Sequence, residues 1–210
     1  IANTSLLTCQ SNRFIDNSTN NFALTVAGDV KVQRFTPYSI TSSYSASIIG
    51  GSGYFDGTGD WLTSSSSSTS FNLGAGDFTI ECWVYPTSAD ILYGKFLIGN
   101  SQDGGVNGWS LNIQRNSAAH GIFLVLNNAI VISSGATTVN VNAWNHIVVV
   151  RSGLGSNNLR IYLNGISVAQ ATVTTNDTTN TAMSIGGDDS AAPYILTGYL
   201  SNARFVKGTA

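Results

Sequence analysis

The sequence predicts an all-β fold, an antiparallel β-sandwich of the jelly-roll type, on three observations. Short apolar runs rich in β-branched and aromatic residues recur along the 210 residues, with Gly, Asn or Ser between them. No window shows the sustained apolar spacing of i, i+3, i+4 and i+7 that an amphipathic helix requires. Segment 144–165 contains two such runs, and the second ends in Asn164-Gly165, a dipeptide typical of a tight hairpin turn.

The N-terminal part is predicted to form short strands separated by polar turns. A polar loop at 16–21 separates the first two strands, and D-G-T-G-D at 56–60 forms a later turn. A serine run at 64–68 cannot bury a side-chain face, so we expect an exposed loop there; a domain linker is the alternative. The expected strands are 6–9, 22–26, 30–35, 47–49, 53–55 and 61–63.

Residues 78–85, F-T-I-E-C-W-V-Y, predict a strong strand. Because side chains alternate along a strand, one face carries four apolar groups, while the other carries two polar and two aromatic ones. The first set is Phe78, Ile80, Cys82 and Val84, and the second is Thr79, Glu81, Trp83 and Tyr85. Pro86 ends the strand, because proline cannot donate to a sheet ladder. We expect Trp83 and Tyr85 to help fill the sandwich.

The C-terminal part continues the pattern of short strands. The run 146–151 is almost continuously β-branched, which is typical of a strand buried on both faces. Trp144 precedes this strand and is expected in the core, so that Trp144→Ala should cost about 3–5 kcal/mol. The expected strands are 96–98, 109–114, 121–126, 129–132, 146–151, 159–163, 167–173, 183–185 and 196–206.

The composition restricts the classes of partner. Charged residues make up 10% of the chain, and the net charge is −2 with no basic cluster, so we expect no nucleic-acid partner. No apolar run approaches the ~18 residues of a membrane span. Abundant Ser, Thr and Asn with 22 Gly are typical of a secreted or particle-assembled β-protein.

Length and cysteine content predict a single domain that needs no disulfide or metal to fold. We expect one domain over 1–210, since β-sandwiches often reach this length. A chain of this size buries roughly 70% of its unfolded surface and therefore needs no metal or disulfide merely to fold. It begins at Ile1 and its single methionine is Met183, so we expect one module of a longer chain, or a processed product. Cys9 and Cys82 are interpreted as buried thiols, with one disulfide as the alternative.

Five motifs occur in order along the chain. They are G-Y-F-D-G-T-G-D-W-L at 53–62, G-D-F-T-I-E-C-W-V-Y-P at 76–86, the hairpin 144–165, S-I-G-G at 184–187 and G-Y-L-S-N-A-R-F-V at 198–206. This series resembles the laminin-G-like domain of the concanavalin A-like lectin/glucanase superfamily. The opening L-L-T-C-Q-S-N-R-F-I-D and the closing K-G-T-A are similar to such modules in large structural proteins of marine bacteriophages.

The resemblance implies a non-catalytic structural or adhesion module of a virion or another extracellular surface protein. Such a module would present rigid loops and pack against copies of itself or against other particle proteins, and its first and last strands would lie side by side. The alternative is a calcium-assisted lectin module that attaches to cell-surface polysaccharide. Fold alone does not decide between these functions.

Enzymatic activity is not expected. Glycoside hydrolysis needs two carboxyl groups beside the scissile bond. Hydrolases of the superfamily supply them as E-x-D-x-x-E, but Glu81 is the only glutamate here and position 83 is Trp. We therefore interpret Glu81 as a polar residue on a strand face, paired with an arginine. His120 and His146 lack a G-x-S-x-G partner motif, and we interpret His146 as a packed histidine.

Calcium is the one cofactor that the resemblance suggests, although none is required. The candidate ligands are Asp188 and Asp189 in G-G-D-D-S with Asp103 in Q-D-G-G, and Asp56 and Asp60 are the second choice. The alternative is that Asp beside Gly is ordinary turn chemistry.

Glycan binding would need an aromatic platform beside fixed polar groups. The predicted ligand-binding aromatics are Tyr194, in the loop A-A-P-Y, and Trp109.

Overall fold

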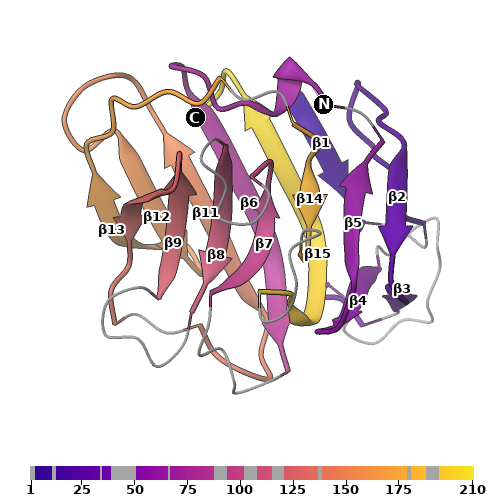
Figure 1. Ribbon diagram of the computed structural model, residues 1–210. Helices are drawn as coiled ribbons and strands as arrows, with labels where there is room; N and C mark the ends of the chain where they lie inside the picture. The colour runs from indigo at the N-terminus through magenta and orange to yellow at the C-terminus, as the bar shows by residue number, and fades with distance from the viewer. Residues whose placement is uncertain are drawn as a thin grey trace.

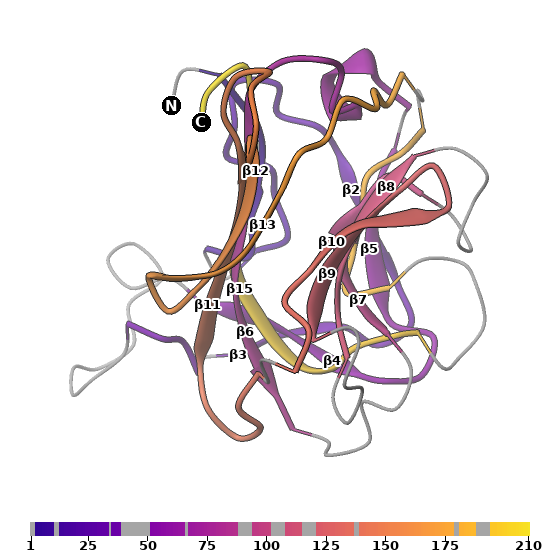
Figure 2. The same cartoon turned by 90° about the vertical axis from the view of Figure 1, so that its left-hand side faces the viewer.

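Two antiparallel β-sheets stack face to face in the computed structural model (Figures 1 and 2), which confirms the predicted all-β sandwich. The structure describes residues 3–10, 13–33, 35–38, 51–65, 67–87, 94–101, 108–114, 121–136, 139–178, 181–187 and 194–210. Within these ranges the helical structure is a single 3₁₀ turn, Thr69–Phe71, whose N-cap is Ser68. No helix in this part of the chain is long and apolar enough to cross a membrane.

The first sheet has eight strands in the order β13-β12-β11-β6-β15-β4-β3, with β1 also paired to β15. Its members are β1 (Thr4–Thr8), β3 (Lys31–Gln33), β4 (Ser52–Asp56), β6 (Phe78–Pro86), β11 (Asn145–Arg151), β12 (Leu159–Leu163), β13 (Ile166–Ala171) and β15 (Thr197–Lys207).

The second sheet has seven strands in the order β10-β9-β8-β7-β14-β5-β2. Its members are β2 (Leu24–Ala27), β5 (Trp61–Ser64), β7 (Lys95–Gly99), β8 (Trp109–Ile113), β9 (Ile122–Leu126), β10 (Ala129–Ser133) and β14 (Ser184–Ile185). The predicted strand 47–49 lies outside the described residues. The serine loop was predicted to begin at Ser64, but Ser64 is the last residue of β5, so the loop begins at Ser65.

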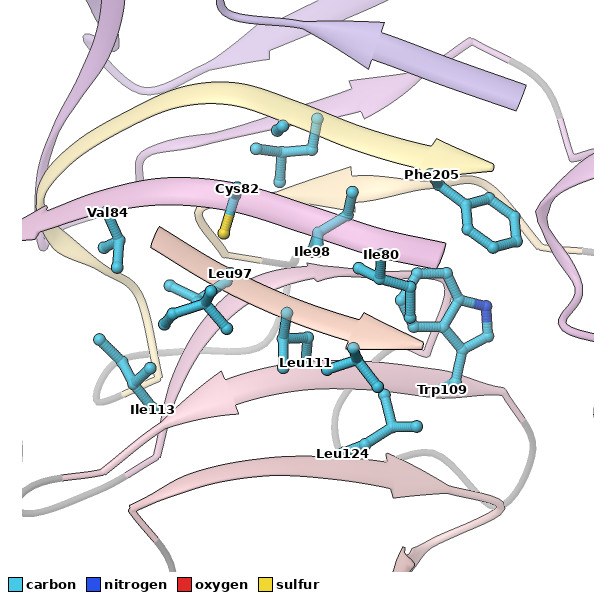
Figure 3. Close-up of a cluster of buried hydrophobic side chains, with 14 of the residues drawn as sticks. Ile80, Cys82, Val84, Leu97, Ile98, Trp109, Leu111, Ile113, Leu124 and Phe205 are labelled. Carbon is cyan, nitrogen blue, oxygen red and sulfur yellow. The ribbon is translucent and has the colours of Figure 1, made fainter. Parts of the chain in front are cut away.

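The core lies between the two sheets and is formed by the inward side chains of strands from both (Figure 3). On β6 the predicted apolar face is the buried one, with Ile80 and Val84 fully covered. Trp109 on β8 is also fully buried, and its ring lies 5.2 Å from that of Phe205 on β15. The indole Nε1 of Trp109 donates a 2.7 Å hydrogen bond to the Phe71 carbonyl, so its polar atom is satisfied inside the core.

The predicted hairpin is confirmed, with one correction. β11 pairs with β12, and β12 turns into β13 through Asn164 and Gly165, whose φ values of 51° and 81° fit a primed hairpin turn. The correction concerns β11, which was expected to be buried on both faces. Only its inward face is buried, and the outward side chains are half-buried because they belong to the open face of the sheet.

The first and last strands lie side by side, as the resemblance implies. β6 pairs along nearly all of β15, whereas the opposite edge of β15 changes partner along its length. Residues 197–200 pair with β4, and residues 203–206 pair with β1. A bulge lies between these two stretches, where Asn202 has a φ of 50°. Bulges bend a strand and redirect its side chains, and this one shapes the site described next.

Candidate functional site

The outer face of the eight-stranded sheet carries the aromatic side chains that were expected in the core. Trp83 and Tyr85 lie on the face of β6 opposite Cys82 and Val84 and are only partly buried. Trp144, directly before β11, is likewise half-buried, and its ring packs against Tyr85 at 5.5 Å. The assignment of these three residues to the interior is therefore corrected: the inward positions of both strands are already filled by other buried side chains, such as Ile80, Val84 and Ile147.

Four aromatic rings form a row across adjacent strands of this face. Tyr199 on β15 lies opposite both Tyr85 on β6 and Tyr54 on β4, and Trp144 extends the row beyond Tyr85. Neighbouring ring centroids along the row are 4.9 to 5.9 Å apart. Phe35 lies on the row, with its ring 4.8 Å from that of Tyr85 and 42% of its surface exposed. Aromatic pairs at such distances stabilise one another.

A hollow of about 310 Å³ lies beside this row, and we call it the Trp83 hollow. It is lined by Leu7, Gln10, Tyr38, Glu81, Trp83, His146, Asn202 and Arg204. These side chains come from β6, β11, β15, the end of β1 and the segment 35–38.

The β15 bulge explains why the hollow exists. The residue opposite Trp83 on β15 is Ser201, whose small side chain leaves space beside the indole ring. Asn202, at the bulge, donates from Nδ2 to the Ser201 hydroxyl and accepts a 2.9 Å hydrogen bond from Gln10 Nε2. The hollow therefore combines one aromatic wall with a fixed pair of amide groups.

Three ionisable side chains of the lining lie close together. Glu81 Oε1 lies 2.6 Å from Arg204 Nη2, and Glu81 Oε2 lies 3.8 Å from His146 Nε2. This ion pair confirms the predicted arginine partner of Glu81. The His146 ring stacks on Trp83 with centroids 4.8 Å apart and an interplanar angle of 22°.

The charge state of His146 follows from its surroundings. Burial lowers the pKa of His146, Glu81 opposes this shift, and the nearby Arg204 charge adds to it. Its pKa therefore lies below the ordinary value of about 6.5, and the imidazole is neutral at pH 7. The hollow then carries one negative and one positive charge.

The sequence-predicted ligand-binding aromatics have different environments. Trp109 is 0% exposed, which removes it from the aromatics that could face a ligand. Tyr194 is 44% exposed, and its carbonyl accepts a hydrogen bond from Phe96 N. Tyr194 remains a predicted ligand contact, and it is not among the residues that line the Trp83 hollow.

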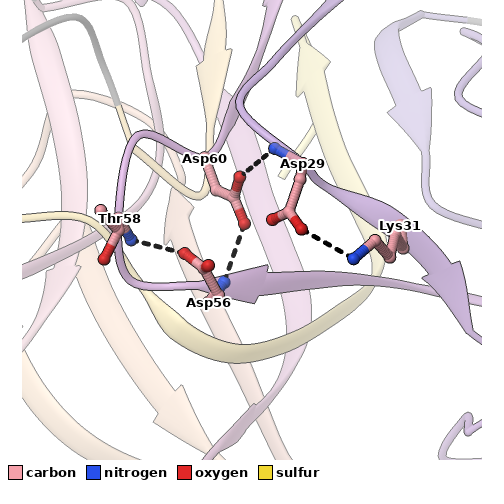
Figure 4. A network of polar contacts seen from close by, with 5 residues as sticks. All are labelled: Asp29, Lys31, Asp56, Thr58 and Asp60. Carbon is pink, nitrogen blue, oxygen red and sulfur yellow. Dashed lines mark hydrogen bonds and ion pairs between the residues drawn. The ribbon is translucent and has the colours of Figure 1, made fainter.

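The first-choice calcium ligands Asp103, Asp188 and Asp189 lie outside the described residues, so this set stays a prediction. The second-choice pair Asp56 and Asp60 does come together, with Asp29 as a third carboxylate (Figure 4).

These three carboxylates already have donors. Asp60 is fully buried and accepts from the backbone N–H groups of Asp29 at 2.6 Å and Asp56 at 2.9 Å. Asp29 pairs with Lys31 at 2.7 Å, and Asp56 accepts from Thr58 N. Burial raises the pKa of Asp60 despite its two hydrogen bonds. These contacts fit a hydrogen-bonded link between two turns, which we call the Asp60 latch, better than a cation site, because Lys31 already supplies the positive charge.

Cys9 and Cys82 are free, buried thiols in the structure, in agreement with the first interpretation rather than with the disulfide. Burial raises the pKa of Cys9 to about 12 and also raises that of Cys82. Neither thiol is therefore a reactive thiolate near neutral pH.

Sequence reasoning missed the Trp83 hollow although part of its signal was present. The alternation of β6 places Trp83 on the same face as Thr79 and Glu81, and these polar neighbours indicate that the face points outward. The contribution of Arg204 depends on pairing β15 with β6, and the contact between Asn202 and Gln10 depends on pairing β1 with β15, residues almost 200 positions apart. No local pattern indicates that pairing.

A model of the Concanavalin A-like lectin/glucanases superfamily, of the laminin-G type, matches residues 56–209. No curated protein matches the chain.

Among solved structures, the chain is similar to the binding domain of Paraclostridial Mosquitocidal Protein 1, with a TM-score of 0.73 and 16% identity over 99% of this chain and 49% of that one. Domain 4 of AbnA, a GH43 extracellular arabinanase from Geobacillus stearothermophilus solved with arabinotriose, gives a TM-score of 0.64 and 14% identity over 97% and 94%. The binding domain of Botulinum Neurotoxin DC in complex with SialylT gives 0.62 and 14% over 97% and 47%. The chain thus spans about half the length of the toxin domains it matches.

Proposed function

The chain belongs to the concanavalin A-like lectin/glucanases superfamily, and from this premise we propose that it is a non-catalytic carbohydrate-binding module whose ligand lies in the Trp83 hollow. The observation that carries the proposal is the outward Trp83 indole beside a fixed set of hydrogen-bonding groups. A sugar ring has an apolar face and a rim of hydroxyl groups. An aromatic wall with convergent polar groups matches both.

The polar groups of the hollow suit hydroxyl recognition. Glu81 offers acceptor oxygens, Arg204 offers donors, and Gln10 and Asn202 offer amides that do both. These groups hold one another in place through the 2.6 Å Glu81–Arg204 contact and the 2.9 Å amide contact. A site that is ordered before the ligand arrives loses less conformational entropy on binding.

The same geometry supports a non-catalytic role. Glu81 is the single carboxylate among the described residues that line the hollow. Hydrolysis of a glycosidic bond needs a second carboxyl group within about 5–9.5 Å across the bond. The matched solved structures are binding domains of toxins and a domain of an arabinanase that was solved with arabinotriose, which agrees with binding rather than catalysis. We propose an extracellular setting on the same grounds.

A second candidate function is packing between copies, in a virion or another surface assembly. It is favoured by the edge strand β13, where Ile166 is 70% exposed and the outer backbone edge has no neighbouring strand among the described residues. The virion setting rests on the sequence resemblance alone. Sedimentation of the wild type at increasing concentration should show association that Ile166→Lys abolishes; a strictly monomeric wild type would contradict this candidate.

The binding proposal is tested by glycan-array screening followed by calorimetric titration of the hits. We expect Trp83→Ala to weaken binding by at least about fivefold, because contact with an aromatic ring contributes about 1–3 kcal/mol. Tyr162→Ala is the matched control, since Tyr162 is a half-buried aromatic on β12 of the same sheet but outside the hollow. A melting curve of each variant shows whether the fold is retained.

Tyr194→Ala tests the competing site predicted from the sequence. The proposal expects this variant to bind as the wild type does. If Tyr194→Ala abolishes binding while Trp83→Ala retains it, the ligand lies elsewhere and the Trp83 hollow is not the site. Failure of the wild type to bind any glycan would overturn the function itself.

A further inference from the structure

We propose that Glu81 is a specificity-determining residue, which makes the Trp83 hollow select neutral sugars over sugars that carry a carboxylate. The inference rests on the proposed carbohydrate-binding function and adds the chemical class of the ligand. It follows from how the charges of the hollow are arranged.

Glu81 neutralises the only strong cation of the lining. Arg204 Nη2 lies 2.6 Å from Glu81 Oε1, and the two side chains are 31% and 23% exposed. Such a partly covered, charge-assisted pair is stronger than a pair on the open surface. His146 adds no charge at neutral pH, because burial lowers its pKa. The described lining therefore has no net charge.

A sugar that carries a carboxylate would bind poorly in this arrangement, because Arg204 is already paired with Glu81. The guanidinium of Arg204 is the group that would bind a carboxylate bidentately. Glu81 already occupies its Nη2 edge, and an incoming carboxylate would have to displace Glu81 or lie beside it at the cost of repulsion between like charges.

A neutral sugar fits the same pair without displacing it. A hydroxyl group both donates and accepts, so one hydroxyl can donate to Glu81 while its neighbour accepts from Arg204. The side chains of Gln10 and Asn202, which also line the hollow, offer the same two-way chemistry. The expected ligand is thus an uncharged oligosaccharide with adjacent free hydroxyls, in contact with the part of the Trp83 indole that His146 and Tyr38 leave open.

The test compares matched pairs of trisaccharides that differ only in a hydroxymethyl group or a carboxylate. Three pairs are titrated calorimetrically at pH 7.5: gluco and glucurono, galacto and galacturono, manno and mannurono. We expect the wild type to bind at least one neutral member at least tenfold more tightly than its acidic partner. Glu81→Gln should reduce this preference by about tenfold, through a gain in affinity for the uronic acid, because Arg204 loses its counter-ion.

Two further variants serve as a control and as a second test of the ion pair. Asp77→Asn is the control for removal of a carboxylate, since Asp77 precedes β6, accepts from Gly153 N and does not line the hollow; its selectivity should equal that of the wild type. Arg204→Gln should weaken the acidic members further, because it leaves Glu81 without its cation. The Arg204→Gln variant also tests the role of the Glu81–Arg204 pair if Glu81→Gln fails to fold.

The outcomes separate the two proposals. Binding of neither series, on these pairs and on the array, contradicts the carbohydrate-binding function. Binding of both series without preference, a wild-type preference for uronic acids, or an unchanged preference in Glu81→Gln contradicts the role of Glu81 while the binding function stands.

Discussion

Trp109 and Trp144 differ in burial although both were candidates for special roles. Trp109 is fully covered between the sheets, whereas Trp144 lies half-buried in the aromatic row on the outer face. The core role that the sequence assigned to Trp144 therefore belongs to Trp109. The ligand contact predicted for Trp109 is proposed instead for Trp83.

This difference gives a stability prediction. Trp109→Ala should lower the free energy of unfolding by about 3–5 kcal/mol, because it leaves a large cavity and removes the shorter of the two hydrogen bonds to the Phe71 carbonyl. Trp144→Ala should cost less than half of that, since part of its surface is already in water. Urea unfolding of the two variants measures both values, and a larger loss for Trp144→Ala would contradict the assigned positions.

His146 gives a prediction about pH. Its pKa in the folded state lies below the unfolded value of about 6.5, so the unfolded chain takes up a proton more readily. The corresponding stability is fully present above the unfolded pKa and is lost as the pH falls below it. We expect the stability of the wild type to fall between pH 7.5 and pH 5 more steeply than that of His146→Gln, as measured by urea unfolding. Equal slopes would show that His146 is not shielded as described.

At the scale of elements, the local patterns were sufficient to place the strands but not to assign their outer faces. The alternation of β6 and the Asn164-Gly165 turn were both predicted correctly, because each depends on a few adjacent residues. The outward position of Trp83 was missed because large aromatic residues usually fill cores. The packing of segment 35–38 over this face, with Phe35 on the aromatic row, brings together residues that are distant in sequence.

The latch formed by Asp60 gives a prediction for the turns it joins. Asp60→Ala removes the acceptor for the partly buried backbone N–H groups of Asp29 and Asp56, and should therefore cost about 1–3 kcal/mol. Thermal melting measures the loss. Addition of millimolar calcium should raise the melting temperature of Asp60→Ala and of the wild type equally, or leave both unchanged, because Asp60 acts as a latch. A calcium-dependent rise that Asp60→Ala abolishes would instead identify this cluster as a metal site.

At the scale of the whole molecule, the pairing of β1 with β15 decides where the candidate site forms. β4 and β1 divide one edge of β15 between them, the bulge lies at the change of partner, and the Trp83 hollow opens there. The sequence predicted the sandwich and the neighbouring first and last strands. It could not predict the hollow, because the hollow depends on the register among three strands from distant parts of the chain.

The most direct test of the account locates the ligand by NMR. The chain has four tryptophans, whose indole N–H signals can be assigned by single Trp→Phe variants. Titration with the best neutral oligosaccharide from the array is expected to shift the indole signal of Trp83 and the backbone signals of Glu81 and Arg204, and to leave the indole signal of the buried Trp109 in place. Shifts confined to Tyr194 and its neighbours, with the Trp83 signal unmoved, would contradict the central claim that the Trp83 hollow binds the glycan.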